Sequence, residues 1–219
     1  MGSEMCIRDS PYSDPVMDGP VIQKASEISL ANGFTIKDVF ATVSSSSVPT
    51  LVMSYWNPIE RFGASEFSSA LRDAGSVGVI TPDLTVEESD SWIDATEQNS
   101  LHRVYVVAPS TSDERLIKVT SKCSGFVYAA SLMGVTGTRS SISSDAESLV
   151  KRIRKVTNTP VSVGLGVSTG SQAREIAQYA DGVIVGSAFI NLILEADSES
   201  DANSKVRALA EELAEAVRR

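Results

Sequence analysis

The chain has 219 residues, and its 42% hydrophobic and 21% charged content is that of an ordinary globular domain. Its net charge of -9 argues against nucleic acid or an acidic membrane as a partner, and no apolar run reaches the roughly 18 residues of a membrane span. Two cysteines without metal or redox spacing favour a reducing, cytoplasmic setting, and a single histidine excludes a metal site built from several histidines.

The first ten residues differ from the rest of the chain. Residues 1–10 show neither strand alternation nor helical periodicity, so we treat them as a leader foreign to a single domain of residues 11–219. Residues 11–20 contain three prolines, one glycine and two aspartates, which is the composition of a loop.

From residue 21 onwards, helical and strand patterns alternate. Helices are predicted over residues 21–31, 35–43, 64–74, 85–98, 112–122, 144–156 and 203–219, with a capping box formed by Thr85 and Glu88. Strands are predicted over residues 49–55, 77–81, 103–107, 125–130, 160–164 and 182–186. Six strands, each followed by a helix, indicate a parallel α/β sheet that is two units short of a (β/α)8 barrel.

Two glycine-rich strand ends form the most informative stretch. Gly164 and Gly166 follow one valine-rich strand, and Gly186 and Ser187 follow the next. Neighbouring ends of this kind direct backbone N–H groups and a helix dipole at one point, where an anion can bind. The pattern therefore predicts a phosphate site, and two ordinary βα turns without a ligand are the alternative.

Six motifs from Pro11 to the C-terminus resemble, in order, the α subunit of tryptophan synthase. They occupy residues 11–20 (PYSDP and DGP), 53–58, 82–89, 134–137, 164–167 and 186–188. The resemblance implies a TIM (β/α)8 barrel that here lacks the first two strands and the first helix. It also implies a lyase of tryptophan biosynthesis, which splits indole-3-glycerol phosphate into indole and glyceraldehyde 3-phosphate by retro-aldol cleavage. The family chain holds no cofactor, because pyridoxal phosphate belongs to the β subunit, its partner in an α2β2 heterotetramer.

The reaction needs an acid that protonates the indole ring and a base that takes a hydroxyl proton. In the family a Glu and an Asp divide these roles, and the Asp matches Asp18. From the residues alone, a turn-forming Asp before Gly19 and Pro20 is the favoured interpretation. The Glu falls in register with Ile7, and neither Glu4 nor Asp9 is in register with it. We therefore expect this chain to have impaired activity.

The resemblance implies further site residues. Tyr128 matches a tyrosine beside the substrate, although a core tyrosine is the alternative. Tyr55 matches an aromatic residue of the indole pocket, Asp83 one that helps to hold the active state, and Asp14 one that faces the β subunit. The phosphate cradle matches Gly164, Gly166, Gly186 and Ser187, and the loop that closes over substrate matches Thr136 and Gly137. No metal site is implied.

Three interpretations remain open. The chain is an active lyase in which a residue of the leader supplies the acid, or a catalytically dead phosphate-binding regulator of a β subunit. The third interpretation is a fragment that does not fold stably. Its unpaired strand edges, at residues 49–55 and 182–186, would make it poorly soluble or favour self-association. Another phosphate-binding barrel lyase or isomerase is a weaker alternative, because the loop of residues 11–20 argues against it.

Overall fold

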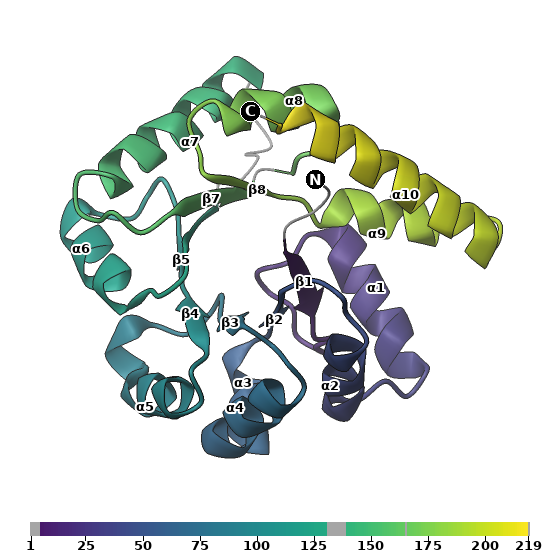
Figure 1. The fold of residues 1–219 in the computed structure, drawn as a ribbon, viewed down its shortest axis with the longest axis horizontal. Coiled ribbons are helices and arrows are strands. Elements are labelled where there is room, and N and C mark those ends of the chain that lie inside the picture. The colour runs from purple at the N-terminus through teal and green to yellow at the C-terminus, as the bar shows by residue number, and fades with distance from the viewer. Residues whose placement is uncertain (1–4, 131–138, 165, 219) are drawn as a thin grey trace. The chain divides into compact units, whose positions relative to one another are not determined.

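A computed structural model describes residues 5–130, 139–164 and 166–218 of the chain. They form two compact units, and Figure 1 labels the helices and strands of both. The N-terminal unit comprises residues 5–106 and 121–125, and the C-terminal unit comprises residues 107–120 and those from 126 onwards. Among the described residues, no helix combines the length and the apolar character needed to cross a membrane.

The N-terminal unit is built on a parallel sheet with strands in sequence order. Its strands are β1 (Cys6–Asp9), β2 (Thr50–Met53), β3 (Gly78–Ile80) and β4 (His102–Val104). Its helices are α1 (Pro20–Ala31), α2 (Ile36–Ser44), α3 (Trp56–Phe62), α4 (Ala64–Asp73), the 3-10 helix η1 (Val86–Glu88) and α5 (Asp90–Gln98). Because all four strands run in parallel, their carboxyl ends meet at one edge.

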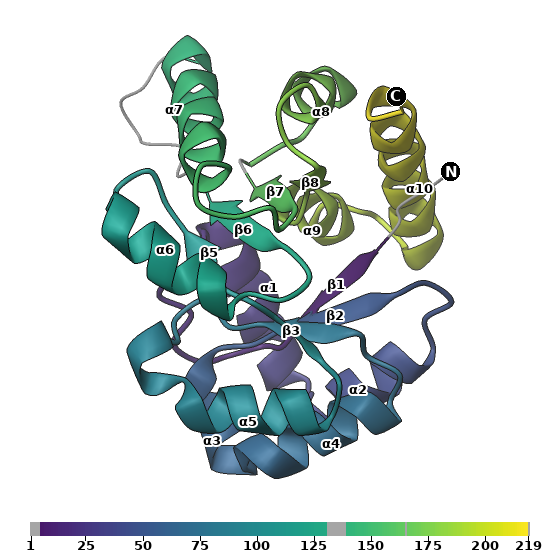
Figure 2. The ribbon, with the colours of Figure 1, turned by 60° about the vertical axis from the view of Figure 1, so that its left-hand side comes forward.

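The helices α2, α4 and α5 cover one face of this sheet (Figure 2). Their apolar residues meet the sheet in a buried core that includes Val52, Phe67, Val79 and Trp92. Phe67 and Trp92 are fully buried, with ring centroids 6.2 Å apart. This packed core fixes the sheet on which the candidate site lies.

The C-terminal unit has a second parallel sheet, again with strands in sequence order. Its strands are β5 (Val106–Val107), whose first residue is counted with the N-terminal unit, β6 (Val127–Ala130), β7 (Val161–Gly164) and β8 (Gly182–Ile184). Its helices are α6 (Asp113–Lys122), α7 (Arg139–Ile153), α8 (Gly170–Ala177), α9 (Ser187–Leu194) and α10 (Glu199–Ala216), and α10 packs on α8 and α9.

Four local features differ from the predictions. The strand predicted over residues 103–107 is interrupted at Tyr105, and α3 was not predicted. The capping box at Thr85 is wrong, because the Glu88 N–H donates to the Thr85 carbonyl oxygen in a 3-10 turn and the Thr85 side chain caps nothing. The capping box instead lies at the start of α2, where Thr35 and Asp38 bind each other.

The fourth difference is β1, which lies inside the segment that we treated as a leader. Residues 6–9 pair in parallel with residues 50–53. The prediction of an unpaired edge at residues 49–55 is therefore wrong. The ladder with β2 defines this four-residue strand, whose own sequence, CIRD, has no apolar alternation.

Candidate active site

In the N-terminal unit, Asp18 and Tyr55 are brought together at the carboxyl edge of the sheet. Tyr55 follows β2 and is 2% exposed. Its hydroxyl donates to the Asp18 carboxylate (Oδ2) at 2.9 Å and accepts from the Met17 N–H at 2.8 Å. The ring of Tyr12 packs on that of Tyr55, with centroids 5.0 Å apart. Two predicted site residues thus form one fixed unit, in which Tyr55 orients the Asp18 carboxylate.

The protein surroundings oppose ionisation of this cluster. Desolvation raises the pKa of Asp18, while the hydrogen bond from Tyr55 acts in the opposite direction. Desolvation also raises the pKa of Tyr55, so its hydroxyl stays protonated and remains a donor. Asp18 is therefore a carboxyl group whose protonation is sensitive to one hydrogen bond.

Asp9 is a second carboxyl group at this edge, which the sequence analysis did not assign to the site. It is the last residue of β1, in register with Met53 of β2. Its side chain keeps access to solvent, yet protein atoms surround most of it. Desolvation, followed by the nearby charge of Asp18, raises the pKa of Asp9 to about 7, and a hydrogen bond from the Ser10 backbone partly opposes this shift.

The strand end that carries Asp9 is firmly held. The Ser10 N–H donates to the Met53 carbonyl oxygen at 2.9 Å, and the Ser10 and Ser54 hydroxyls lie 2.7 Å apart in a buried contact. The signal that could have revealed Asp9 in the sequence is its position two residues after Ile7, since residues i and i+2 of a strand share a face.

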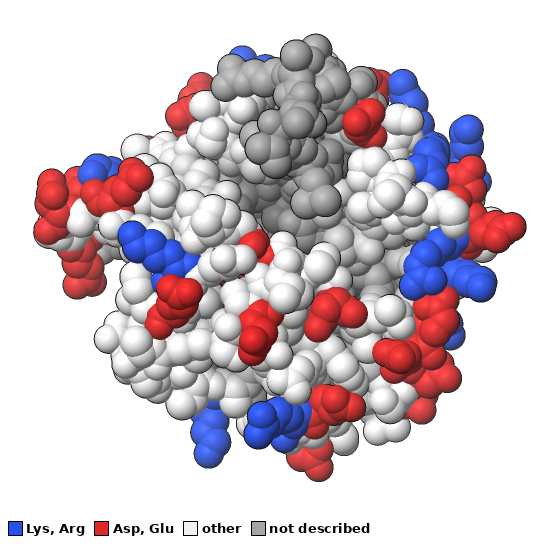
Figure 3. Space-filling view, turned by 180° about the vertical axis from the view of Figure 1, so that it is seen from behind, with Lys and Arg blue, Asp and Glu red and all other residues white. Residues whose placement is uncertain are grey.

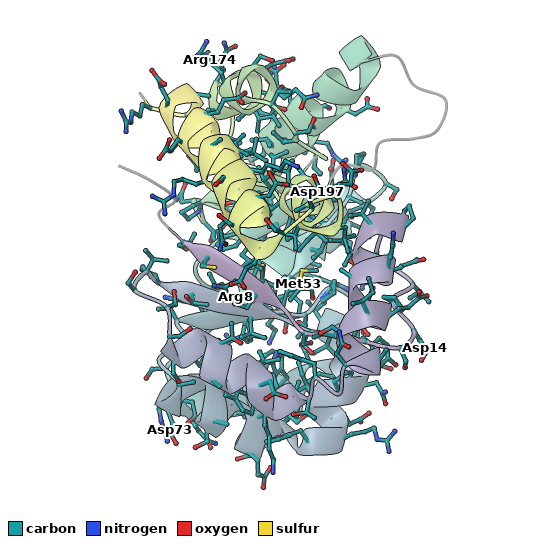
Figure 4. The ribbon with its side chains drawn as sticks, turned by 90° about the vertical axis from the view of Figure 1, so that its right-hand side faces the viewer. Arg8, Asp14, Met53, Asp73, Arg174 and Asp197 are labelled. Atoms are coloured by element: carbon teal, nitrogen blue, oxygen red, sulfur yellow. The ribbon has the colours of Figure 1, made fainter. Side chains whose placement is uncertain are left out.

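Two further predicted residues lie in this unit. The Asp83 carboxylate (Oδ1) accepts from the Trp56 N–H at 2.9 Å and so holds the start of α3, while desolvation raises its pKa. Asp14 is exposed in the loop after β1 and accepts from the Ser13 hydroxyl at 2.6 Å. Figure 4 shows Asp14 at the periphery beside α1, whereas Met53 lies at the sheet.

In the C-terminal unit, the predicted glycines lie at adjacent strand ends. Gly164 closes β7 and is in register with Ala130 of β6 and Ile184 of β8. Gly186 is the residue before α9, so β8 leads almost directly into a helix N-terminus, as predicted. A Cβ built on Gly186 would have no neighbour within 4 Å, which leaves its backbone open to a ligand.

Tyr128 lies against this edge. A Cβ on Gly164 would be 2.5 Å from the Tyr128 hydroxyl oxygen, so any larger residue would force this ring to move. Gly166 has φ +63°, a left-handed conformation that favours glycine. The C-terminal unit therefore brings together Tyr128, Gly164, Gly186 and Ser187, whereas Thr136 and Gly137 lie outside the described residues.

Clusters of metal ligands and a reactive thiol are two further features for which the described residues can be searched. These residues contain no group of three or more His, Cys, Asp or Glu side chains that could hold a metal ion. Burial raises the pKa of Cys123 to about 11, so its thiol stays protonated at neutral pH and does not act as a thiolate nucleophile. On the face shown in Figure 3, acidic side chains run across the middle and basic ones lie mainly towards the edge, so this face presents no continuous basic surface for a polyanion.

The family model described as "Tryptophan synthase alpha chain" matches residues 7–218. The chain belongs to this family. The match begins at Ile7 and therefore includes most of β1. Membership gives the chain a role in tryptophan biosynthesis and makes it a lyase by family.

Individual relatives agree with this assignment. The tryptophan synthase alpha chain of Streptomyces avermitilis is 54% identical over an alignment of 212 residues, with 95% of this chain and 76% of that protein covered. The alpha chain of Thermobifida fusca is 52% identical over 214 residues, with coverage of 95% and 79%.

Solved structures give the fold. A chain of M. tuberculosis tryptophan synthase in an aminoacrylate-bound form has a TM-score of 0.90 at 42% identity, with 99% of this chain and 82% of that chain covered. The A-subunit from Pyrococcus furiosus has a TM-score of 0.85 at 33% identity, with coverage of 94% and 84%. The prediction of the (β/α)8 barrel family is confirmed.

Proposed function

We propose that this chain cleaves indole-3-glycerol phosphate to indole and glyceraldehyde 3-phosphate. The observation that carries the proposal is the Asp18 carboxylate, which the Tyr55 hydroxyl holds at 2.9 Å at the carboxyl edge of the sheet. The carboxyl ends of barrel strands are where enzymes of this fold place their catalytic groups. Asp18 acts as the base that takes the proton of the hydroxyl next to the breaking C–C bond.

Substrate binding is assigned to the C-terminal unit. The phosphate is held by backbone N–H groups at Gly164, Gly166, Gly186 and Ser187, where the N-terminus of α9 adds its partial positive charge. Thr136 and Gly137 belong to the segment that closes over the bound substrate. Tyr128, whose ring covers Gly164, contacts the substrate beside the phosphate.

A β subunit is the expected partner, and the pyridoxal phosphate of the complete reaction belongs to that subunit. The exposed loop after β1 is the expected docking surface. Asp14 lies there, and Val16 and Met17 are 80% and 56% exposed, which is unusual for apolar side chains in a single loop. An α2β2 assembly in the cytoplasm is the arrangement that the resemblance implies.

The test is indole release from indole-3-glycerol phosphate by the purified chain, with and without a β subunit. A cooperative thermal transition must first show that the chain is folded. Release that disappears in Asp18→Asn supports the proposal. Folded protein that releases no indole under either condition contradicts it.

A second function is favoured by one observation, the apolar Ile7 of β1 in the register of the family's Glu. In this alternative the chain is a catalytically dead regulator that still binds glycerol phosphate and a β subunit. It predicts that the chain stimulates a β subunit while releasing no indole of its own.

A further inference from the structure

We propose that Asp9 is the second catalytic carboxyl group of this site, the acid that protonates the indole ring carbon bearing the side chain. The assignment rests on the proposed cleavage reaction. It gives a catalytic role to a residue of the segment that the sequence analysis had set apart.

Strand geometry is the first argument. Side chains alternate across a strand, so Asp9 shares a face of β1 with Ile7 and lies about 6.6 Å further towards the carboxyl end. The parallel register with β2 brings this end to the edge where Tyr55 lies, directly before α3. Asp9 therefore offers a carboxyl group at the edge that carries Asp18, on the strand face where Ile7 offers none.

The mutual influence of the carboxyl groups is the second argument. The charge of Asp18 acts on Asp9, and the charges of both act on Tyr55, so the three groups form one electrostatic cluster. Only Asp18 accepts the Tyr55 hydroxyl, which favours its charged form. Two carboxyl groups whose surroundings separate their protonation divide into an acid and a base. Asp9, whose pKa is about 7, is the member that still carries a proton near neutral pH.

The surroundings of β1 add few other charges. Its partner β2 contains only Thr50, Leu51, Val52 and Met53. The helix α2, which also packs on β1, contributes Lys37 and Asp38, and the Asp38 carboxylate is bound to Thr35 at the helix start. On β1 itself, Arg8 is the neighbour of Asp9 and points to the opposite face.

The chemistry balances with these two groups alone. Asp9 gives its proton to the ring carbon, and Asp18 takes the proton of the side-chain hydroxyl. The electron pair of that O–H bond becomes the second C–O bond of the aldehyde as the C–C bond breaks. The electron pair of the broken C–C bond restores the aromatic indole, so neither an oxidant nor a reductant is needed. Solvent access allows Asp9 to take up a new proton and Asp18 to release its own.

The experiment compares Asp9→Asn with the unsubstituted chain and with Asp94→Asn, which removes an exposed carboxylate from α5 of the same unit. We expect Asp9→Asn to slow indole release by about 100-fold or more, the usual contribution of a general acid. Asp94→Asn should retain the full rate. Asp9→Glu, which restores the carboxyl group one methylene further out, should recover at least about tenfold of the loss.

The pH profile separates an acid from a residue that only supports the fold. The rate of the unsubstituted chain should fall as the pH rises through about 7, because Asp9 must be protonated. This limb should be missing from the residual activity of Asp9→Asn. If Asp9→Asn does not fold, Asp9→Glu provides the test. A change in the pH at which the rate falls supports the assignment, and an unchanged pH overturns it.

The two proposals fail in different ways. If the folded, unsubstituted chain releases no indole, the cleavage function is wrong and the role of Asp9 is wrong with it. If the unsubstituted chain releases indole and Asp9→Asn matches Asp94→Asn, the function stands and the assignment of Asp9 is overturned.

Discussion

The two units use their sheet edges in different ways. At the edge of the N-terminal unit, the proposed chemistry belongs to side chains: the carboxyl groups of Asp9 and Asp18 and the hydroxyl of Tyr55. At the edge of the C-terminal unit, the proposed phosphate site is made of backbone, because it uses the N–H groups at Gly164 and Gly186. Substitutions at the first edge should therefore change rates and pH dependence, whereas those at the second should change binding and packing.

The largest effect is expected from Asp18→Asn. It removes the base and leaves an amide beside the Tyr55 hydroxyl, so indole release should fall by about 100-fold to 10,000-fold. The KM for indole-3-glycerol phosphate should change little, since the proposal places Asp18 at the reacting atoms and assigns phosphate binding to other residues. Steady-state kinetics across substrate concentrations give both quantities. If Asp18→Asn instead loses substrate binding and keeps its maximal rate, the proposed difference between the two edges is wrong.

The next effect is expected from Gly164→Ala. Its Cβ would meet the Tyr128 hydroxyl oxygen at 2.5 Å and the ring at 2.6 Å. Overpacking of this kind costs about 1–3 kcal/mol of the free energy of unfolding, which urea denaturation measures. The matched control is Gly164→Ala combined with Tyr128→Ala, which removes the obstructing ring. If the double variant loses as much free energy of unfolding as the two single variants together, the two residues are not in contact.

The sequence pattern of alternating strands and helices predicted more of the candidate site residues at the C-terminal sheet edge than at the N-terminal one. Glycine after a valine-rich strand is a local signal, and parallel pairing then places Gly164 beside β8. The bond between Tyr55 and Asp18 joins residues 37 positions apart, which no local pattern contains. The strand carrying Asp9 was missed because four residues without alternation become a strand only through their ladder with β2.

A smaller effect is expected from Tyr55→Phe, which tests whether Tyr55 positions Asp18. The hydrogen bond from Tyr55 lowers the pKa of Asp18, so its removal should raise that pKa and move the acid limb of the rate profile to higher pH. We expect a rate loss of about tenfold at neutral pH, equivalent to one hydrogen bond to a charged group.

Tyr12→Phe is the matched control for this variant. It removes a hydroxyl from the other ring of the same aromatic pair, where that hydroxyl accepts only from Asn57 at 3.1 Å among the described contacts. Its acid limb should remain in place. If Tyr55→Phe and Tyr12→Phe move the acid limb of the rate profile equally, the cause is the packing of the two rings and not the hydrogen bond to Asp18.

The smallest effect is a pH dependence of stability that belongs to the N-terminal edge alone. The pKa of Asp9 is about 7 in the folded chain and 3.8 in its unperturbed state. Between these values the folded state binds more protons than the unfolded one, so the free energy of unfolding falls as the pH rises from about 4 to about 7. The loss should be about 1 kcal/mol, because solvent access to the side chain weakens the effect.

Urea denaturation at several pH values between 4 and 8 measures this slope. Asp9→Asn should reduce this slope, to which Asp18 and Asp83 with their raised pKa values still contribute. Asp9→Asn should also be the more stable chain at pH 8, although it is the less active one, since the desolvated charge of Asp9 is gone. Asp94→Asn should keep the slope, and so should Gly164→Ala, because the glycine edge owes its chemistry to backbone groups that do not titrate. Parallel slopes for Asp9→Asn and the unsubstituted chain would mean that Asp9 ionises as it does in water, and the two edges would then differ in activity but not in their response to pH.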